Sequence, residues 1–302
     1  MYDVIILGGG AAGLTALLYA RRYGLNAMLI EELYLGGQII NTAEIENYPG
    51  FPTSVSGMDL MSDLEKQARL YNPAIVYETV TGVDFSGAAK IVRTEGNQYE
   101  SRCVIAATGQ NSRELGLTRE KELRGAGVSY CATCDGNFFR DKTVAIAGGG
   151  DTAVTEALFL SRICRKVYII HRRDSFRAAK AEVEKLRSTG NIETVMNSQV
   201  RELLGDSKVE GIQVAENGGA SRALEVSALF IAVGAIPQSG LFKGVLEMDG
   251  YGYIITDDDM RTNIPGVFAA GDVRRKTLRQ LVTAAADGAT AAHNAMHYIE
   301  ET

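Results

Sequence analysis

Two cysteines, Cys131 and Cys134, have the spacing that most directly suggests chemistry. Side chains at positions i and i+3 of a helical turn lie about 5–6 Å apart, which is within the separation that a disulfide tolerates. A bridge across four residues closes almost no chain and adds little loop-closure stabilisation, so a redox role is favoured over a structural one. At a helix start one thiol can be acidified, and a thiolate is the species that attacks another disulfide. Asp135, which follows directly, could deliver or remove the proton.

A CxxC motif can also be half of a zinc site, or it can occur by chance. No second CxxC supplies the remaining ligands of a tetrahedral zinc site, and the three histidines, His171, His293 and His297, are scattered along the chain. We therefore expect no metal. Cys103, in an apolar strand, and Cys164, near a helix end, are expected to be small buried side chains. A regulatory thiol at Cys164 stays an alternative.

A nucleotide-binding pattern opens the chain. Residues 2–7 are β-branched and apolar, residues 8–13 read G-x-G-x-x-G, and residues 11–23 predict a helix that ends before Gly24. A second strand over residues 26–30 ends at Glu31. In such a βαβ unit the glycines let backbone amides approach a pyrophosphate, and the acid accepts hydrogen bonds from ribose hydroxyls. The candidate contacts in the turn are Gly8, Gly10, Ala11, Ala12 and Gly13.

A second copy of this pattern starts near residue 142. A strand over residues 142–147 leads into G-x-G-x-x-A, a helix follows to about Cys164, and residues 166–170 predict the next strand. That strand ends in basic residues instead of an acid. Guanidinium groups pair with a 2′-phosphate through charge-assisted hydrogen bonds, so this site should prefer NADPH to NADH. A solvated basic helix start is the alternative. The candidate contacts are Gly148, Gly150, Asp151, Thr152, Ala153, His171, Arg172, Arg173 and Arg177.

The two patterns define the expected fold class. We predict an α/β protein with two Rossmann-like, three-layer dinucleotide-binding domains. The alternation over residues 76–95 is typical of antiparallel strands, and a similar strand-rich insert recurs over residues 193–213. The halves therefore look like internal duplicates. The predicted boundaries are 1–113 and 241–302 for the first domain and 114–240 for the second, which carries the CxxC.

The C-terminal stretch is expected to complete the first site. Residues 267–272 predict a strand ending in Gly271-Asp272, and residues 278–299 predict an amphipathic helix. Asp272 could bind a ribityl hydroxyl, and the helix N-terminus could stabilise negative charge on a reduced flavin ring. An ordinary terminal helix would explain the periodicity but not the Gly-Asp pair before it.

Length and charge limit the classes of function. The chain has 302 residues, which favours two domains, and a formal net charge of −6, which disfavours nucleic acid or an anionic membrane as a partner. No run approaches the ~20 apolar residues of a membrane span, and residues 1–10 read as a strand and turn instead of a signal peptide. Sparse cysteines argue against a secreted scaffold, so we expect a cytoplasmic protein.

Motifs along nearly the whole chain resemble the low-molecular-weight thioredoxin reductase family, in that family's order. The most specific is Cys-Ala-Thr-Cys-Asp-Gly at residues 131–136. The others are residues 8–13, 36–38, 46–50, 107–109, 148–153, 171–177, 271–273 and 279–280. The resemblance implies a homodimer with tightly bound FAD, the two-dinucleotide-binding flavoprotein fold, reduction by NADPH, and a small thioredoxin-like protein as substrate.

The resemblance also implies roles for individual residues. Cys134 would lie nearest the flavin, Cys131 would attack the partner disulfide, and Asp135 would be the general acid. Departures from the family pattern are modest: Thr155 replaces the first acid of a frequent Glu-Glu pair, and residues 234–238 read Gly-Ala-Ile-Pro-Gln instead of Gly-His-x-Pro-Asn. The flavin would be lined by Gly37, Gln38, Asn47, Thr108, Gly109, Gly271, Asp272, Arg279, Gln280 and Leu281.

The residue order also predicts a movement. The cysteine pair and the nicotinamide site both belong to the second domain, yet each must meet the flavin held by the first. We therefore expect rotation of the second domain about two crossing segments, near residues 110–117 and 235–244.

Three alternatives stay open: the same chemistry with another client, a flavin-bearing redox sensor, and a ferredoxin–NADP reductase, which lacks the CxxC. Relatives that take electrons from ferredoxin lack the second fingerprint and its arginines, both present here.

Overall fold

The computed structural model describes residues 1–42 and 44–302 and contains two compact units. Unit 1 comprises Met1–Asn111 and Ile236–Thr302, and unit 2 comprises Ser112–Ala235. The sequence places the boundaries at 113/114 and 240/241, within the same two crossing segments. Which cofactor each unit holds stays a prediction.

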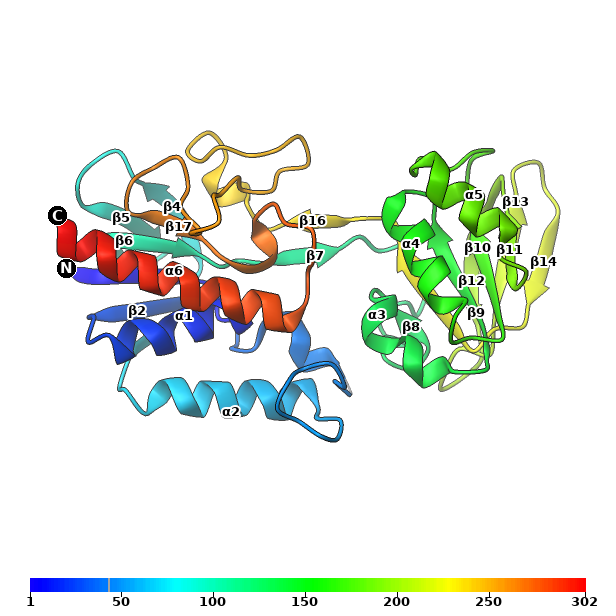
Figure 1. The fold of residues 1–302 in the computed structure, drawn as a ribbon, viewed down its shortest axis with the longest axis horizontal. Coiled ribbons are helices and arrows are strands. Elements are labelled where there is room, and N and C mark those ends of the chain that lie inside the picture. The colour runs from blue at the N-terminus through cyan, green and yellow to red at the C-terminus, as the bar shows by residue number, and fades with distance from the viewer. Residues whose placement is uncertain (43) are drawn as a thin grey trace. The chain divides into compact units, whose positions relative to one another are not determined.

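Unit 1 is built on a seven-stranded sheet of order β3-β2-β1-β6-β5-β4, with β17 beside β6 (Figure 1). The strands β1, β2, β3, β6 and β17 pair in parallel, and β4 and β5 extend the sheet in antiparallel register. The bounds are β1 Tyr2–Leu7, β2 Ala27–Glu31, β3 Ala74–Tyr77, β4 Val80–Asp84, β5 Lys90–Thr94, β6 Gln98–Ala106 and β17 Val267–Ala269.

The helices of unit 1 include two that pack closely together. α1 (Ala11–Arg22) lies along α6 (Leu281–Glu301), as Figure 1 shows. A Cβ atom on Gly288 would lie 2.1 Å from the carbonyl oxygen of Ala12, so only glycine permits this approach. The remaining helical segments are α2 Gly57–Arg69 and the 3₁₀ turns η1 Gly37–Asn41, η3 Gly240–Phe242 and η4 Gly271–Val273.

Unit 2 repeats the parallel arrangement on a smaller scale. Its main sheet has the order β11-β10-β9-β15-β8, and a separate antiparallel sheet has the order β12-β13-β14. Buried apolar side chains such as Ile146, Val167 and Phe230 form its core. The bounds are β8 Val128–Ser129, α3 Ala132–Asp135, η2 Gly136–Phe139, β9 Thr143–Gly148, α4 Asp151–Leu160, β10 Lys166–Ile170, α5 Lys180–Ser188, β11 Ile192–Val195, β12 Ser198–Leu204, β13 Gly211–Glu216, β14 Ser221–Leu224 and β15 Ala228–Ala232.

Both predicted βαβ units are present, which confirms the fold class of two Rossmann-like units. β1 and β10 begin and end where the sequence places them. The two inserts expected to be antiparallel, residues 76–95 and 193–213, do contain the antiparallel pairs β4–β5 and β12–β13. Their first residues, however, belong to the edge strands β3 and β11, which pair in parallel with β2 and β10. Two helix bounds were wrong. α4 ends at Leu160, before Cys164, and α6 begins at Leu281 instead of residue 278.

The chain passes between the units in two short strands, β7 (Gln110–Ser112) and β16 (Ala235–Pro237), which pair with each other. The Arg113 amide donates to the Gly234 carbonyl, and the Gln238 amide donates to the Gly109 carbonyl. The two predicted crossing segments therefore begin as one two-stranded ribbon. Across the described chain, no helix is long and apolar enough to cross a membrane.

Candidate functional site

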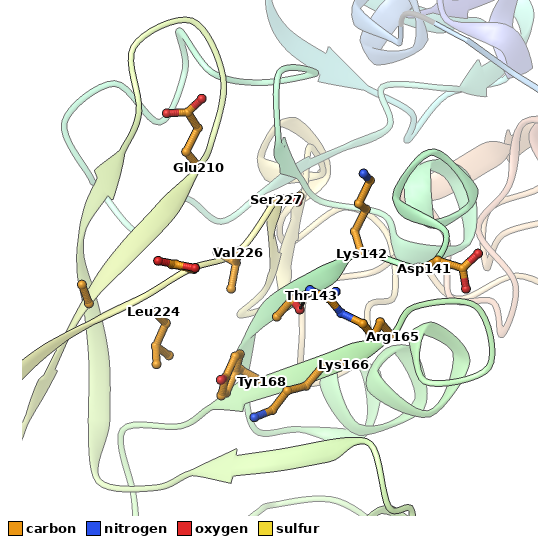
Figure 2. A pocket seen from close by; sticks show the side chains of 12 residues that line it. Asp141, Lys142, Thr143, Arg165, Lys166, Tyr168, Glu210, Leu224, Val226 and Ser227 are labelled. Atoms are coloured by element: carbon orange, nitrogen blue, oxygen red, sulfur yellow. Dashed lines mark hydrogen bonds between the residues drawn. The ribbon is translucent and has the colours of Figure 1, made fainter.

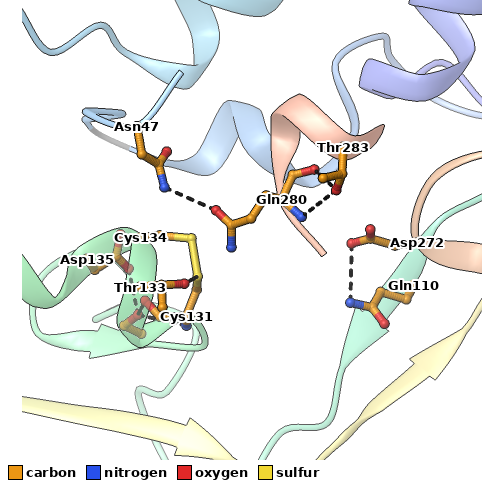
Figure 3. Close-up of a disulfide and its surroundings, with 10 residues drawn as sticks. Asn47, Gln110, Cys131, Thr133, Cys134, Asp135, Asp272, Gln280 and Thr283 are labelled. Atoms are coloured by element: carbon orange, nitrogen blue, oxygen red, sulfur yellow. Dashed lines mark hydrogen bonds between the residues drawn. A yellow bond between two sulfur atoms is a disulfide. The ribbon is translucent and has the colours of Figure 1, made fainter. Parts of the chain in front are cut away.

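Cys131 and Cys134 form a disulfide at the start of α3 in unit 2 (Figure 3). Their Cα atoms lie 5.3 Å apart, as predicted for positions i and i+3 of a helical turn. β8 leads directly into the pair, and the Asp135 amide closes the turn by donating to the Cys131 carbonyl at 3.1 Å. A short strand followed by a single helical turn therefore positions both sulfur atoms.

Asp135 is held against this turn by Ser129. The Ser129 hydroxyl donates to the Asp135 carboxylate at 2.6 Å and accepts from the Cys131 amide at 3.1 Å. Burial raises the pKa of Asp135, although the hydrogen bond from Ser129 and the charge of Arg124 act in the opposite direction. A carboxyl group with a raised pKa thus stands next in sequence to Cys134.

Glu156, on α4, is a second buried acid at the cysteine turn, and sequence reasoning missed it. Its carboxylate accepts a hydrogen bond from the Ala132 amide, and burial raises the pKa of Glu156 to about 7. Its Oε2 atom is buried and has no hydrogen-bond partner within the described residues. The sequence did offer a signal: Thr155 replaces the first acid of a frequent Glu-Glu pair, and Glu156 is the acid of that pair that this chain keeps.

Glu120 fixes the residue that precedes the cysteine pair. The buried Glu120 carboxylate accepts from the Tyr130 hydroxyl at 2.7 Å and from the amides of Leu115 and Leu117. These two amides belong to the crossing segment predicted at residues 110–117. The segment that enters unit 2 is therefore bonded, through one side chain, to the residue next to Cys131.

The fingerprint of unit 2 forms the expected strand–turn–helix. A Cβ atom on Gly148 would lie 2.4 Å from the Ala232 carbonyl oxygen, which explains the glycine by packing, whereas Gly150 faces open space. Asp151 accepts from the Ala179 amide at 2.9 Å, at the start of α4. Its neighbour Thr152 is exposed, and Ala153 is buried against β9. The open backbone at Gly150 fits a nucleotide phosphate.

The basic residues predicted for the 2′-phosphate lie beside this loop. The Arg177 amide donates to the Gly149 carbonyl at 2.7 Å. His171 is buried, stacks on Phe176, and occupies the space that a Cβ atom of Gly149 would need. Burial and the nearby arginines lower the pKa of His171. Within the described residues no ion pair is formed by the exposed side chains Arg172, Arg173 and Arg177.

In unit 1 the first fingerprint forms a tight cradle. Gly8 has φ 103°, and a Cβ atom on Gly13 would lie 1.8 Å from the Gly8 carbonyl oxygen. Gly10 is open except for the Cα of Gly37 at 3.9 Å, so the backbone there can approach a ligand. Ala11 and Ala12, also predicted contacts, begin α1.

Glu31 ends β2 beside this cradle. Its Oε2 atom accepts from the Gly9 amide at 2.7 Å, and its Oε1 atom accepts from the amides of Glu32 and Leu33. A carboxylate can accept about four hydrogen bonds, which leaves room for a ribose hydroxyl. Glu31 therefore both shapes the loop and keeps acceptor capacity.

Asp272 and Arg279 carry buried polar atoms that could bond to a ligand. The Oδ1 atom of Asp272 and the Nε atom of Arg279 are buried with no hydrogen-bond partner in the described part of the chain. The other oxygen of Asp272 accepts from Gln110 at 3.3 Å (Figure 3), and the Arg279 guanidinium lies over the Tyr253 ring. Burial raises the pKa of Asp272. Unpartnered buried polar atoms are rare in proteins, so these residues fit the edge of a bound flavin.

The remaining predicted flavin residues are linked to one another within unit 1. Asn47 donates to Gln280 at 3.1 Å, and Gln280 also caps α6 through Thr283. Gln38 donates to Asn111 at 3.1 Å. The other predicted residues lie at loop or helix ends: Gly37 in η1, Thr108 and Gly109 after β6, Gly271 in η4 and Leu281 at the start of α6.

A polar hollow of about 610 Å³ lies elsewhere in unit 2 (Figure 2). It is lined by Thr143 and Lys166, which begin β9 and β10, and by charged residues of both signs. Ligands of open α/β sheets bind at the carboxyl ends of the strands, whereas this hollow is at their amino ends. It is therefore separate from the predicted nucleotide site.

The comparisons with known proteins agree with this arrangement. Residues 2–288 match the family described as pyridine nucleotide-disulphide oxidoreductase. Thioredoxin reductase from Peptoclostridium acidaminophilum is 45% identical, with 99% of this chain and 98% of that protein covered. Thioredoxin reductase from Listeria monocytogenes is 44% identical, with 100% and 95% covered. The thioredoxin reductase structure from Streptococcus pyogenes has a TM-score of 0.96 at 42% identity, with 100% and 99% covered.

Proposed function

The chain belongs to the thioredoxin reductase family of pyridine nucleotide-disulphide oxidoreductases, and from this premise we propose that it is an NADPH-dependent thioredoxin-disulfide reductase. The observation that carries the proposal is the Cys131–Cys134 disulfide at the start of α3, in the unit that also holds three exposed arginines beside a nucleotide fingerprint. When bound, FAD supplies a two-electron relay between NADPH and the cysteine pair.

The chemistry of the cysteine pair balances as a dithiol–disulfide exchange. Reduction of the Cys131–Cys134 bond takes up two electrons and two protons and gives two thiols. The Cys131 thiolate then attacks one sulfur of the partner disulfide, forms a mixed disulfide and releases one partner thiolate. The Cys134 thiolate attacks Cys131, restores the internal disulfide and frees the second partner thiol. The family resemblance assigns Cys131 to the partner and Cys134 to the flavin side.

Two acids are placed to handle protons in this exchange. Asp135 bonds to Ser129, and Glu156 accepts from the Ala132 amide, so each is fixed relative to the cysteine turn. We propose Asp135 as the group that protonates the thiolate leaving in each half of the exchange, because it follows Cys134 directly and burial raises the pKa of its carboxyl.

We propose that unit 1 holds FAD and unit 2 holds NADPH. FAD binding to unit 1 is supported by the open backbone at Gly10, by the hydrogen-bond acceptor Glu31 and by the buried Oδ1 atom of Asp272, which has no partner among the described residues. Support for the second comes from Gly150 and the exposed arginines. We also propose a homodimer in the cytoplasm, to be checked by light scattering and by cell fractionation.

Anaerobic titration of the holoprotein with NADPH, NADH and reduced ferredoxin tests the electron source, and NADPH-dependent reduction of thioredoxin tests the activity. We expect NADPH to reduce the flavin fastest and thioredoxin to be turned over. Cys134→Ser should abolish turnover, whereas the matched control Cys164→Ser should not, because Cys164 is a buried free thiol. Flavin reduction without disulfide turnover would favour a redox sensor instead.

The arginines are tested by a double substitution. Arg172→Ala with Arg173→Ala removes two candidate partners of the 2′-phosphate, and hydrogen bonds to charged groups contribute about 1.5–3 kcal/mol each. We therefore expect kcat/KM with NADPH to fall by at least about 100-fold, with little change for NADH. Arg162→Ala, on the same unit, is the control. An equal loss with both nucleotides would contradict recognition of the phosphate.

A further inference from the structure

We propose that His293 and His297 form a surface chelate for one divalent transition-metal ion of the Zn²⁺, Cu²⁺ or Ni²⁺ type. The two residues stand one turn apart on α6, at positions i and i+4, and both side chains are exposed. Their Nε2 atoms lie 3.1 Å apart, with ring planes at 90° to each other. Nothing in the proposed reductase chemistry uses them.

The separation of the two nitrogens suits a shared metal ion. With a usual metal–nitrogen distance of about 2.0–2.1 Å and a bond angle between about 90° and 109°, two ligating nitrogens lie about 2.9–3.3 Å apart. The observed 3.1 Å falls inside this range. Two facing Nε2 atoms can hold only one proton between them, and a metal ion that replaces this proton bonds to both lone pairs.

Each imidazole is also held at its far nitrogen. The Nδ1 atom of His293 lies 3.4 Å from the Tyr23 hydroxyl, and the Nδ1 atom of His297 lies 3.5 Å from the Glu300 carboxylate. A metal-bound histidine ordinarily donates its other N–H to an oxygen acceptor, which fixes the ring and strengthens the ligand. Tyr23 and Glu300 can both accept such a bond.

The frame that carries these groups is rigid. Tyr23 follows the last residue of α1, and α1 packs closely on α6 through Gly288. The Tyr23 and His293 rings are 6.0 Å apart, so the chelate is supported from a second helix. Helix packing therefore places Tyr23 beside the His293 imidazole, and His293 in turn contacts the His297 imidazole.

The donor set selects the class of ion. Imidazole suits Zn²⁺, Cu²⁺ and Ni²⁺, whereas Mg²⁺ and Ca²⁺ prefer oxygen ligands. Within the described chain no group of three or more His, Cys, Asp or Glu side chains could hold a metal. Two protein ligands therefore leave the remaining coordination positions to water, and we expect a micromolar, exchangeable site.

Calorimetric titration of the untagged, oxidised holoprotein with CuCl₂ and NiCl₂ tests this proposal. The disulfide is kept oxidised because free thiols at Cys131 and Cys134 would compete for the metal. We expect one ion per chain, and nitrogen superhyperfine lines from two imidazoles in the Cu²⁺ EPR spectrum. Titration with MgCl₂ should give no binding.

Substitutions then assign the ligands. His293→Ala and His297→Ala should each weaken binding at least tenfold and leave one imidazole or none in the EPR spectrum. Glu300→Gln should weaken it by about tenfold, the lower end of the range for groups that support a ligand. Glu301→Gln, the adjacent exposed carboxylate, is the matched control.

Unchanged affinity in the His293→Ala, His297→Ala double variant would overturn the proposal, as would the absence of micromolar binding in the wild type. Both side chains are exposed, so circular dichroism should show unchanged folding in every variant. Reductase activity is measured separately, and its loss or survival does not bear on the metal result.

Discussion

Asp135 and Glu156 approach the cysteine turn from two directions, and burial raises the pKa of both. Asp135 is the next residue after Cys134, whereas Glu156 reaches the backbone between the two cysteines from α4. A general acid can protonate a leaving thiolate only if the acid still carries its proton at the working pH. The contributions of the two acids can therefore be tested separately, that of Asp135 by catalysis and that of Glu156 by stability.

For Asp135 we expect Asp135→Asn to lower kcat for thioredoxin reduction by about 10²- to 10⁴-fold, the usual contribution of a general acid. Ser129→Ala is a milder variant, which keeps the Asp135 carboxyl but changes its hydrogen bonding. It removes a hydrogen bond that lowers the pKa of Asp135, so the alkaline limb of the pH–rate profile, where the general acid loses its proton, should move to higher pH. An unchanged profile in Ser129→Ala would show that Asp135 does not set this limb.

For Glu156 the expected signature is in stability. Its pKa is raised from 4.5 to about 7, so between these pH values the folded chain binds more protons than the unfolded chain. Stability contributed by this group is present below pH 4.5 and is lost as the pH rises through 7. Glu156→Gln should therefore match the wild type at low pH and exceed it above neutrality, by at most about 3 kcal/mol. Urea unfolding measures this, with exposed Glu184→Gln as the control.

At the scale of elements, α6 does more than cover the sheet of unit 1. Asp287 on α6 accepts from the Gly271 amide at 3.0 Å and from the side chains of Arg274 and Lys276 at 2.9 and 2.7 Å. These bonds tie the helix to the loop that carries Asp272. The loop predicted to contact the flavin is therefore fixed by a buried ion cluster.

We expect Asp287→Asn to lower the free energy of unfolding by about 3–5 kcal/mol at neutral pH, because it leaves buried cations without their partner. Burial acts to raise the pKa of Asp287, but the hydrogen bonds and charges of Arg274 and Lys276 together hold it below its ordinary value of 3.8. The stabilisation is therefore complete above that value and is lost as the pH falls below it. The difference between wild type and variant should shrink there in urea unfolding, and a constant difference would argue against the ion pairs as its source.

The approach of α1 and α6 gives a second prediction at this scale. Gly288→Ala places a Cβ atom 2.1 Å from the Ala12 carbonyl oxygen, so the helices must separate. We expect a loss of about 1–3 kcal/mol, typical of overpacking, measured by thermal unfolding. Gly82→Ala, where nothing lies within 4 Å of the added atom, is the matched control.

At the scale of the whole molecule, the division into two units sets a requirement on movement. The cysteine pair and the second fingerprint both belong to unit 2, and both must reach the redox group that we assign to unit 1. The β7–β16 ribbon and the bonds of Glu120 to Leu115, Leu117 and Tyr130 connect the crossing segment to the cysteine turn. We predict that unit 2 rotates about this ribbon during turnover.

Single-molecule energy transfer between dyes on the two units tests the rotation. We expect two distance populations whose ratio changes when NADP⁺ is added. One distance that stays constant through turnover would contradict the prediction.

The sequence predicts those parts of the fold and site that local patterns specify. Residues 2–7, the turn at Gly8–Gly13 and the disulfide between Cys131 and Cys134 follow from periodicity, glycine spacing and i,i+3 geometry. The partners of buried polar groups could not be predicted, since Glu156 and Asp287 act through contacts made only after the helices pack. The alternation over residues 76–95 correctly predicted the antiparallel pair β4–β5, but it did not separate this pair from β3, which pairs in parallel with β2.

The interruption of unit 1 by unit 2 has a consequence for synthesis on the ribosome. Every residue of Ser112–Ala235 is made before Ile236–Thr302, so the unit that begins second in sequence is the first that can fold to completion. Until α6 emerges, the apolar face of α1 that packs on it has no cover. We therefore expect the nascent chain to carry a completed unit 2 next to an unfinished unit 1, and chaperones to bind the N-terminal segment.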